Sequence, residues 1–79
     1  MNSDKASYES TEEVIATVYA VQTELSIVRL RAGNRLFGFG PRVPGAPPLS
    51  RLTVGMRCKL LVGPRLNKVL GVKILYDEL

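Results

Sequence analysis

The sequence predicts a small all-β domain built from five strands. β-branched and aromatic residues gather in short segments whose apolar and polar positions alternate, and Gly, Pro and Asn residues separate these segments. No long segment shows a convincing helical periodicity. The chain has 79 residues, of which 46% are hydrophobic, and this is enough for one compact core and one domain.

The first predicted strand covers residues 13–22, and a turn at residues 23–24 follows it. Its even positions would form one apolar face: Val14, Ala16, Val18 and Ala20. A short helix over residues 12–20 is the alternative. Residues 1–11 are polar and aperiodic, which predicts a disordered N-terminal tail before a single domain over residues 12–79.

The second and third strands are predicted to form a hairpin. Residues 25–31 alternate between one face with Val28 and Leu30 and an opposite face with Ile27, Arg29 and Arg31. Residues 32–34, Ala-Gly-Asn, provide a turn in which Gly and Asn can adopt positive φ. Residues 35–39 form the returning strand.

Two more strands follow an irregular connection. Residues 40–50 contain four prolines and two glycines, which favours a structural connector over a preformed docking segment. The last strands are predicted at residues 57–62 and 69–76, joined by residues 63–68. Their apolar faces would be formed by Cys58, Leu60 and Val62 in the former and by Leu70, Val72 and Ile74 in the latter.

Five strands with the longest break after the third favour a small closed barrel. An SH3-like barrel is the alternative, because a pattern of strands does not determine their order in the sheet.

Positive charge is segregated along the chain. Ten of the eleven Lys and Arg residues lie between Glu24 and Asp77, a stretch without a single Asp or Glu, although the whole chain carries only +4. A surface of one sign repels itself, so this segregation indicates an anionic partner, most simply a nucleic acid. The alternative is that the Arg side chains only cover apolar surface with their stems.

Three segments resemble the S1-like branch of the OB fold, and in particular the bacterial translation initiation factor one family: Glu13 to Tyr19 leading to Leu25, residues 28–36 around a glycine turn, and residues 52–60 (LTVGMRCKL). Residues 37–40 (FGFG) are similar to the RNA-binding strand of cold-shock proteins. The resemblance implies a five-stranded OB-fold barrel and an RNA-binding role in translation. The chain departs from the family at Met56, where Asp is usual, and at Arg29 and Arg31, where acids are common.

The hairpin over residues 25–39 is the first candidate site. If Arg31 pairs with Arg35, the cations would share one face with two rings, and Arg29, Arg31 and Arg35 would neutralise phosphates. Phe37 and Phe39, together with Tyr19, would then stack on bases. In a register shifted by one residue, both Phe rings would instead enter the core.

Other cations are expected to extend this interface, because OB folds also bind nucleic acid with the loop between the fourth and fifth strands. They are Arg42, Lys59, Arg65, Lys68 and Lys73. A solvated turn with incidental charges is the alternative for Arg65 and Lys68.

Catalysis and metal binding are not expected. The chain has no histidine, its basic stretch has no carboxylate, and its one cysteine, Cys58, is predicted to be a buried apolar residue. We therefore expect no enzymatic activity and no cofactor. No run of about 18 apolar residues and no secretory leader is present, so a cytoplasmic monomer that does not contact membranes is expected.

The expected partner is RNA or single-stranded DNA, bound mainly through phosphates with limited stacking on bases. The alternative function is a protein-interaction module of the same fold that docks on an acidic surface of a larger assembly, such as the ribosome or RNA polymerase. Binding to an anionic membrane surface lacks support, because no amphipathic helix is predicted.

Overall fold

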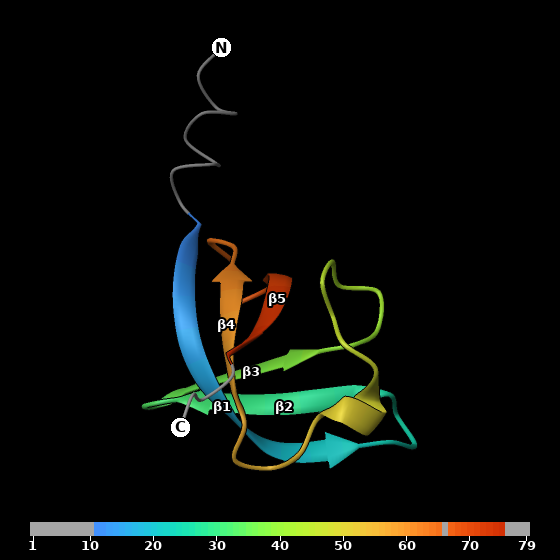
Figure 1. Ribbon diagram of the computed structural model, residues 1–79. Helices are drawn as coiled ribbons and strands as arrows, with labels where there is room; N and C mark the ends of the chain where they lie inside the picture. Colours follow the sequence, from blue (N-terminus) through green and yellow to red (C-terminus); the bar gives the residue numbers. More distant parts are fainter. Residues whose placement is uncertain (1–10, 66, 76–79) are drawn as a thin grey trace.

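The computed structural model describes residues 11–65 and 67–75, which form one antiparallel five-stranded sheet (Figure 1). The strands are β1 (Glu12–Gln22), β2 (Ile27–Ala32), β3 (Arg35–Phe39), β4 (Arg57–Val62) and β5 (Val69–Leu75), and a single 3-10 turn covers Leu49–Arg51. The predicted all-β fold class is confirmed. Residues 1–10 of the predicted tail, and Tyr76 at the predicted end of the last strand, lie outside the described residues.

The strand order is β3-β2-β1-β4-β5. Tight turns connect β1 to β2 and β2 to β3, and a long connection then returns to place β4 beside β1, which is a Greek key. The first half of β1 pairs with β4 and its second half with β2, so that the hairpin of β2 and β3 lies across that of β4 and β5 (Figure 1). This is the arrangement of the OB fold, a partly open Greek-key barrel.

The sheet does not close, which corrects the predicted closed barrel. Strands β3 and β5 are its two edges and lie near each other, but the described residues form no ladder between them. The connection after β3 covers the edge of β5, because the Val72 N–H donates to the Pro44 carbonyl at 3.1 Å. Gly45 has φ +81° and lies so close to the Val72 carbonyl that no Cβ would fit. The proline-rich segment is therefore a packed structural connector.

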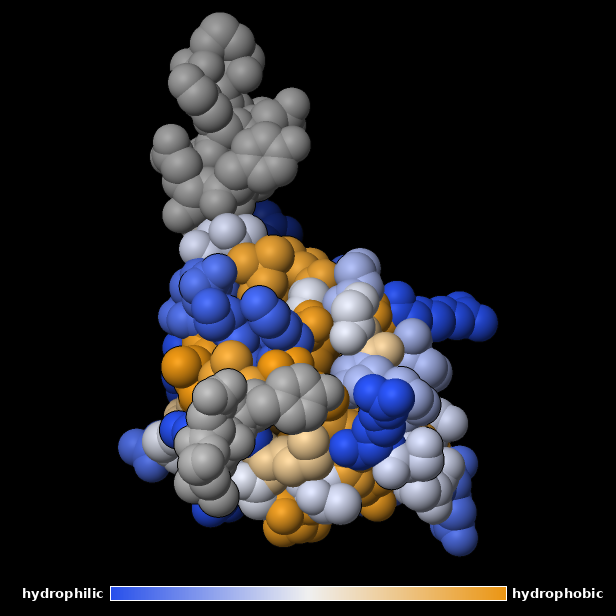
Figure 2. Space-filling view, viewed as in Figure 1, coloured by the Kyte–Doolittle hydropathy of each residue, from blue (hydrophilic) through white to orange (hydrophobic). Residues whose placement is uncertain are grey.

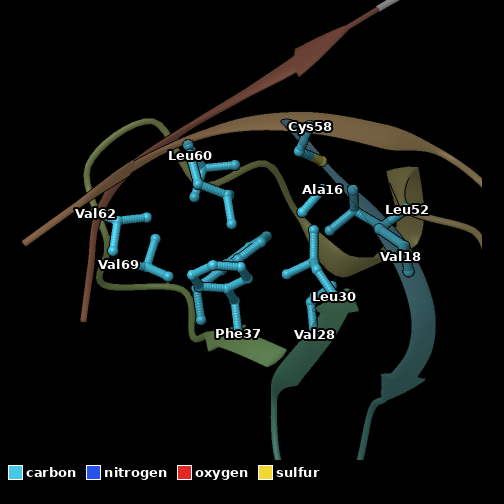
Figure 3. Packing of buried hydrophobic residues seen from close by; sticks show 12 residues of the cluster. Ala16, Val18, Val28, Leu30, Phe37, Leu52, Cys58, Leu60, Val62 and Val69 are labelled. Carbon is cyan, nitrogen blue, oxygen red and sulfur yellow. The ribbon is translucent and has the colours of Figure 1, made fainter. Parts of the chain in front are cut away.

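Apolar side chains from all five strands meet in one core (Figure 3). Its buried members are Ala16, Val18, Val28, Leu30, Phe37, Phe39, Leu52, Cys58, Leu60, Val62, Val69 and Val72. The predicted burial of Cys58 is confirmed, and desolvation raises the pKa of its thiol. A buried thiol with a raised pKa carries little reactive thiolate.

The pairing of β2 with β3 differs from the predicted register by one residue. The turn has two residues, Gly33 and Asn34, with φ +64° at Gly33, and it places Ala32 opposite Arg35. Leu30 consequently faces Phe37, and both Phe37 and Phe39 point into the core, where they are 4% and 5% exposed. The predicted stacking platform of Phe37 and Phe39 is therefore wrong, because a shift of one residue moves every side chain to the other face.

A second irregularity changes the core contribution of β5. The register shifts between Leu61 and Val62, and Val62 pairs with Val69. As a result Val69 is buried, whereas Leu70 is only partly buried. The predicted alternation beginning at Leu70 therefore fails at the start of the strand, because a bulge interrupts the period of two.

Candidate nucleic-acid interface

Cations gather on the outer face of the sheet, the face directed away from the core. Thr17 in the centre of β1 pairs with Arg31 on one side and with Arg57 on the other. In the next row, Lys59 pairs with Ile15 and with Lys73. Strands lie about 4.8 Å apart, so these charges come close together although they are distant in sequence. We call the following set the outer basic face: Tyr19, Arg29, Arg31, Arg57, Lys59 and Lys73.

The pair of Lys59 and Lys73 places two positive charges directly opposite each other on neighbouring strands. Like charges at such positions repel and destabilise a sheet. The Glu13 carboxylate offsets part of this repulsion, since its Oε1 lies 3.8 Å from the Lys59 Nζ at the border of the face. Lys73 remains exposed. A bound anion would relieve the repulsion that is left.

Tyr19 supplies the ring of this face. The register of β1 and β2 shifts between Val18 and Ala20, so Tyr19 is the extra residue of a bulge and points outward. It is 38% exposed, and the Arg31 guanidinium lies 5.4 Å from its ring centroid. Tyr19 and Arg31 thus form a pair that has both a π surface and a positive charge. Of the stacking residues predicted from the sequence, Tyr19 is the one whose ring is exposed.

Arg29 lies on the same face of β2, two residues from Arg31. Its Nε donates to Gln22 Oε1 at 2.7 Å, which holds the guanidinium over the end of β1. Its partner on β3 is Gly38, so the residue directly opposite has no side chain to cover it. The position of Arg29 leaves the rest of the guanidinium open to a ligand.

Arg35 has a different environment from the one predicted. Its Nη1 and Nη2 donate to the two carboxylate oxygens of Glu12 at 3.2 and 3.1 Å, and Nη2 also donates to Asn67 Oδ1 at 3.0 Å. The guanidinium lies 5.2 Å from the Phe37 ring centroid. Arg35 therefore joins β3 to β1 and to the β4–β5 loop near the open side of the barrel. Its predicted contact with phosphate has no support in this geometry.

The Glu12–Arg35 pair predicts a pH dependence of stability. Hydrogen bonds from Arg35 hold the pKa of the Glu12 carboxyl below its ordinary value, so the pair stabilises the folded state above the unfolded-state pKa of about 4.3. This stability is lost as the pH falls through the lower folded-state pKa. We expect the melting temperature of Glu12→Gln to depend less on pH than that of the unmodified protein between about pH 5 and pH 3.

Thermal melts followed by circular dichroism would measure this difference. Glu13→Gln is the matched control, because it removes a carboxylate from the same strand and leaves the Arg35 contacts in place. Equal pH dependence in Glu12→Gln and the unmodified protein would refute the proposed role of the pair.

A groove of about 610 Å³ runs beside β3. Leu36, Phe37, Gly38 and Phe39 of that strand line one side, and residues of the β4–β5 loop line the other. Among the described residues that line it are three cations, Arg29, Arg65 and Lys68, and no carboxylate. The groove thus brings the predicted cations of the loop, which are exposed, close to Arg29 of the hairpin.

Besides Arg35, two basic residues of the described part of the chain fall outside these surfaces. Arg42 and Arg51 are exposed in the connection between β3 and β4, and neither belongs to the outer basic face or lines the groove. Conversely, Arg57 was not among the predicted site residues. Its alternation with Cys58 in the predicted strand was the signal that could have placed it beside Lys59 on the outer face.

On the side of the molecule shown in Figure 2, hydrophilic and hydrophobic residues are interspersed. On the outer face of β1, Ile15 is 54% exposed and lies opposite Lys59 of β4. Such a surface offers both charges and apolar contacts to a ligand.

No protein-family model, curated protein or solved structure matches the chain. Within residues 11–65 and 67–75, no helix is long and apolar enough to cross a membrane. In the same residues, no three side chains of the metal-ligating types His, Cys, Asp and Glu come together.

Proposed function

We propose that the protein is a non-enzymatic binder of single-stranded nucleic acid, RNA or single-stranded DNA, and that the outer basic face is its contact surface. One observation carries the proposal: the fold places Lys59 opposite Lys73, and Arg31 and Arg57 on both sides of Thr17, next to an exposed tyrosine. The repulsion between Lys59 and Lys73 destabilises the sheet, and a bound polyanion would offset it.

The binding mode follows from the residue types. Arg29, Arg31 and Lys73 would contact phosphates, which supplies affinity without sequence selectivity. Tyr19 would stack on one base, a contact worth about 1–3 kcal/mol. Stacking on a side chain requires an unpaired base, so single strands are favoured over duplexes. One ring implies a limited base preference.

The groove beside β3 extends this surface on one side only. Arg29 belongs to both the outer basic face and the groove, whereas Arg65 and Lys68 lie on the far side of the groove from β3. A strand of nucleic acid that follows the outer basic face therefore need not enter the groove.

The affinity for a short oligouridine should fall steeply with salt. About three phosphate contacts at about 0.7 each predict a slope of about −2 for the logarithm of the binding constant against the logarithm of salt concentration. Fluorescence anisotropy of labelled RNA over a series of KCl concentrations would measure the slope, with a duplex of the same sequence as competitor. Absence of saturable binding at low salt, or an affinity independent of salt, would refute the proposal.

A further inference from the structure

Strand β3 presents a free backbone edge. Ala32 and Arg35 flank a two-residue turn, so the N–H and C=O groups of Arg35 point toward β2 and bond to Ala32. This orientation repeats every two residues along an antiparallel strand, so the N–H and C=O groups of Phe37 and Phe39 also point toward β2. The N–H and C=O groups of the residues between them, Leu36 and Gly38, therefore point away from β2. They face the open side of the barrel, where both residues line the groove.

The two edge strands of the sheet differ in whether other residues cover them. The edge of β5 is covered by the connection after β3, since Val72 donates to the Pro44 carbonyl. Among the residues that the structure describes, none forms a backbone hydrogen bond to Leu36 or Gly38 across the free edge. Proteins usually protect an edge with a proline, a bulge or an inward-pointing charge, and β3 has neither proline nor bulge. Its inward-directed charge, Arg35, lies at the start of the strand and is bonded to Glu12. Gly38, the next-to-last residue of the strand, has no side chain to obstruct approach.

The residues beside this edge indicate which kind of ligand could bind there. Arg29 lies on the outer side, and Arg65 and Lys68 stand across the groove, whereas Asn67 is already held by Arg35. None of the lining residues that the structure describes is acidic. The floor is apolar, formed by Phe37, Phe39 and Val69. An extended ligand with hydrogen-bonding groups at the spacing of a strand, and with negative side chains, would complement these features.

We propose that the free edge of β3 binds an extended acidic peptide of a partner protein, which adds to the sheet as a further strand. A peptide repeats its N–H and C=O groups every two residues, the same spacing that separates Leu36 from Gly38. Nucleic acid has no such repeat. A second copy of this chain would bring its own cations to the same place and be repelled. This inference does not rest on the proposed nucleic-acid function.

The test uses Gly38, because two substitutions there separate the backbone from the side chain. Gly38→Pro removes the outward N–H and fills the edge with the ring, yet loses no bond to β2, and proline is tolerated at such edges. Gly38→Ala keeps the N–H, and its Cβ would lie 3.6 Å from the Val28 carbonyl oxygen, an ordinary contact. A displayed library of random ten-residue peptides would be selected on the unmodified protein, and the enriched peptide then synthesised and titrated.

We expect the enriched sequences to be acidic with alternating apolar residues. The synthetic peptide should protect the Leu36 and Gly38 amides from hydrogen exchange and bind Gly38→Pro at least about tenfold more weakly, with Gly38→Ala within about twofold of the unmodified protein. If Gly38→Pro does not fold, the double charge reversal Arg65→Glu/Lys68→Glu supplies the second test, with a loss of at least about tenfold expected.

Four results would overturn the inference. They are no enrichment, enrichment of basic peptides, equal binding to a folded Gly38→Pro, and dimerisation of the free protein that Gly38→Pro abolishes. Oligouridine could instead protect the Leu36 and Gly38 amides from hydrogen exchange, and Gly38→Pro could weaken its binding. That result would mean that the edge of β3 binds nucleic acid and not a peptide.

Discussion

Replacing Phe37 with alanine is expected to lower the free energy of unfolding by about 3–5 kcal/mol, the usual cost of removing a buried phenylalanine. Its side chain is 4% exposed and directed from β3 toward Leu60 and Val69 (Figure 3). Folded domains are stable by roughly 0.05–0.15 kcal/mol per residue, which is about 4–12 kcal/mol for a chain of 79 residues. The expected loss is a large part of this free energy of unfolding. Urea denaturation followed by circular dichroism would measure it.

Phe37→Leu is the control, because it keeps most of the apolar volume and should cost less than about 1.5 kcal/mol. This variant should also bind RNA as the unmodified protein does. If Phe37→Ala kept full stability but lost affinity for RNA, the ring would be a stacking residue after all, and the register of β2 and β3 given by the structure would be wrong.

Removing two charges from the outer basic face should have the largest effect on binding. In Arg31→Gln/Lys73→Gln, two phosphate contacts disappear, and a charge pair at an exposed site is worth up to about 1 kcal/mol. We expect an affinity for oligouridine about tenfold lower, and a salt slope that is less steep by about 1.4. Anisotropy titrations would measure both.

Arg42→Gln/Arg51→Gln is the matched control, since it removes the same charge from the connection between β3 and β4. It should change the affinity less than about threefold, through the net charge alone. Equal losses in the two double variants would mean that the protein attracts RNA through its overall charge and has no defined contact surface.

Much of the fold could be predicted because the strands are half-buried. Alternation of apolar and charged residues in 57–62 determined both the bounds of β4 and which side chains face the solvent. The same reasoning placed Arg29 and Arg31 on one face of β2, as observed. The exposure of these cations therefore follows from the local sequence.

Features that depend on turn length and on distant contacts could not be predicted. Gly33-Asn34 and Ala32-Gly33-Asn34 are both reasonable turns, and the choice between them decides whether Phe37 is exposed or buried. The partner of Arg35 is Glu12, which is 23 residues away in sequence and reaches it only after the barrel forms. The bulge at Tyr19 likewise depends on how β1 bends between its two neighbours.

Chemical-shift perturbation of the backbone amides by a short oligouridine at low salt tests the central claim most directly. The proposed function predicts the largest shifts at Tyr19, Arg29, Arg31, Arg57, Lys59 and Lys73, with Arg42 and Arg51 unaffected. Shifts confined to the connection between β3 and β4, or no shifts at any RNA concentration, would contradict it.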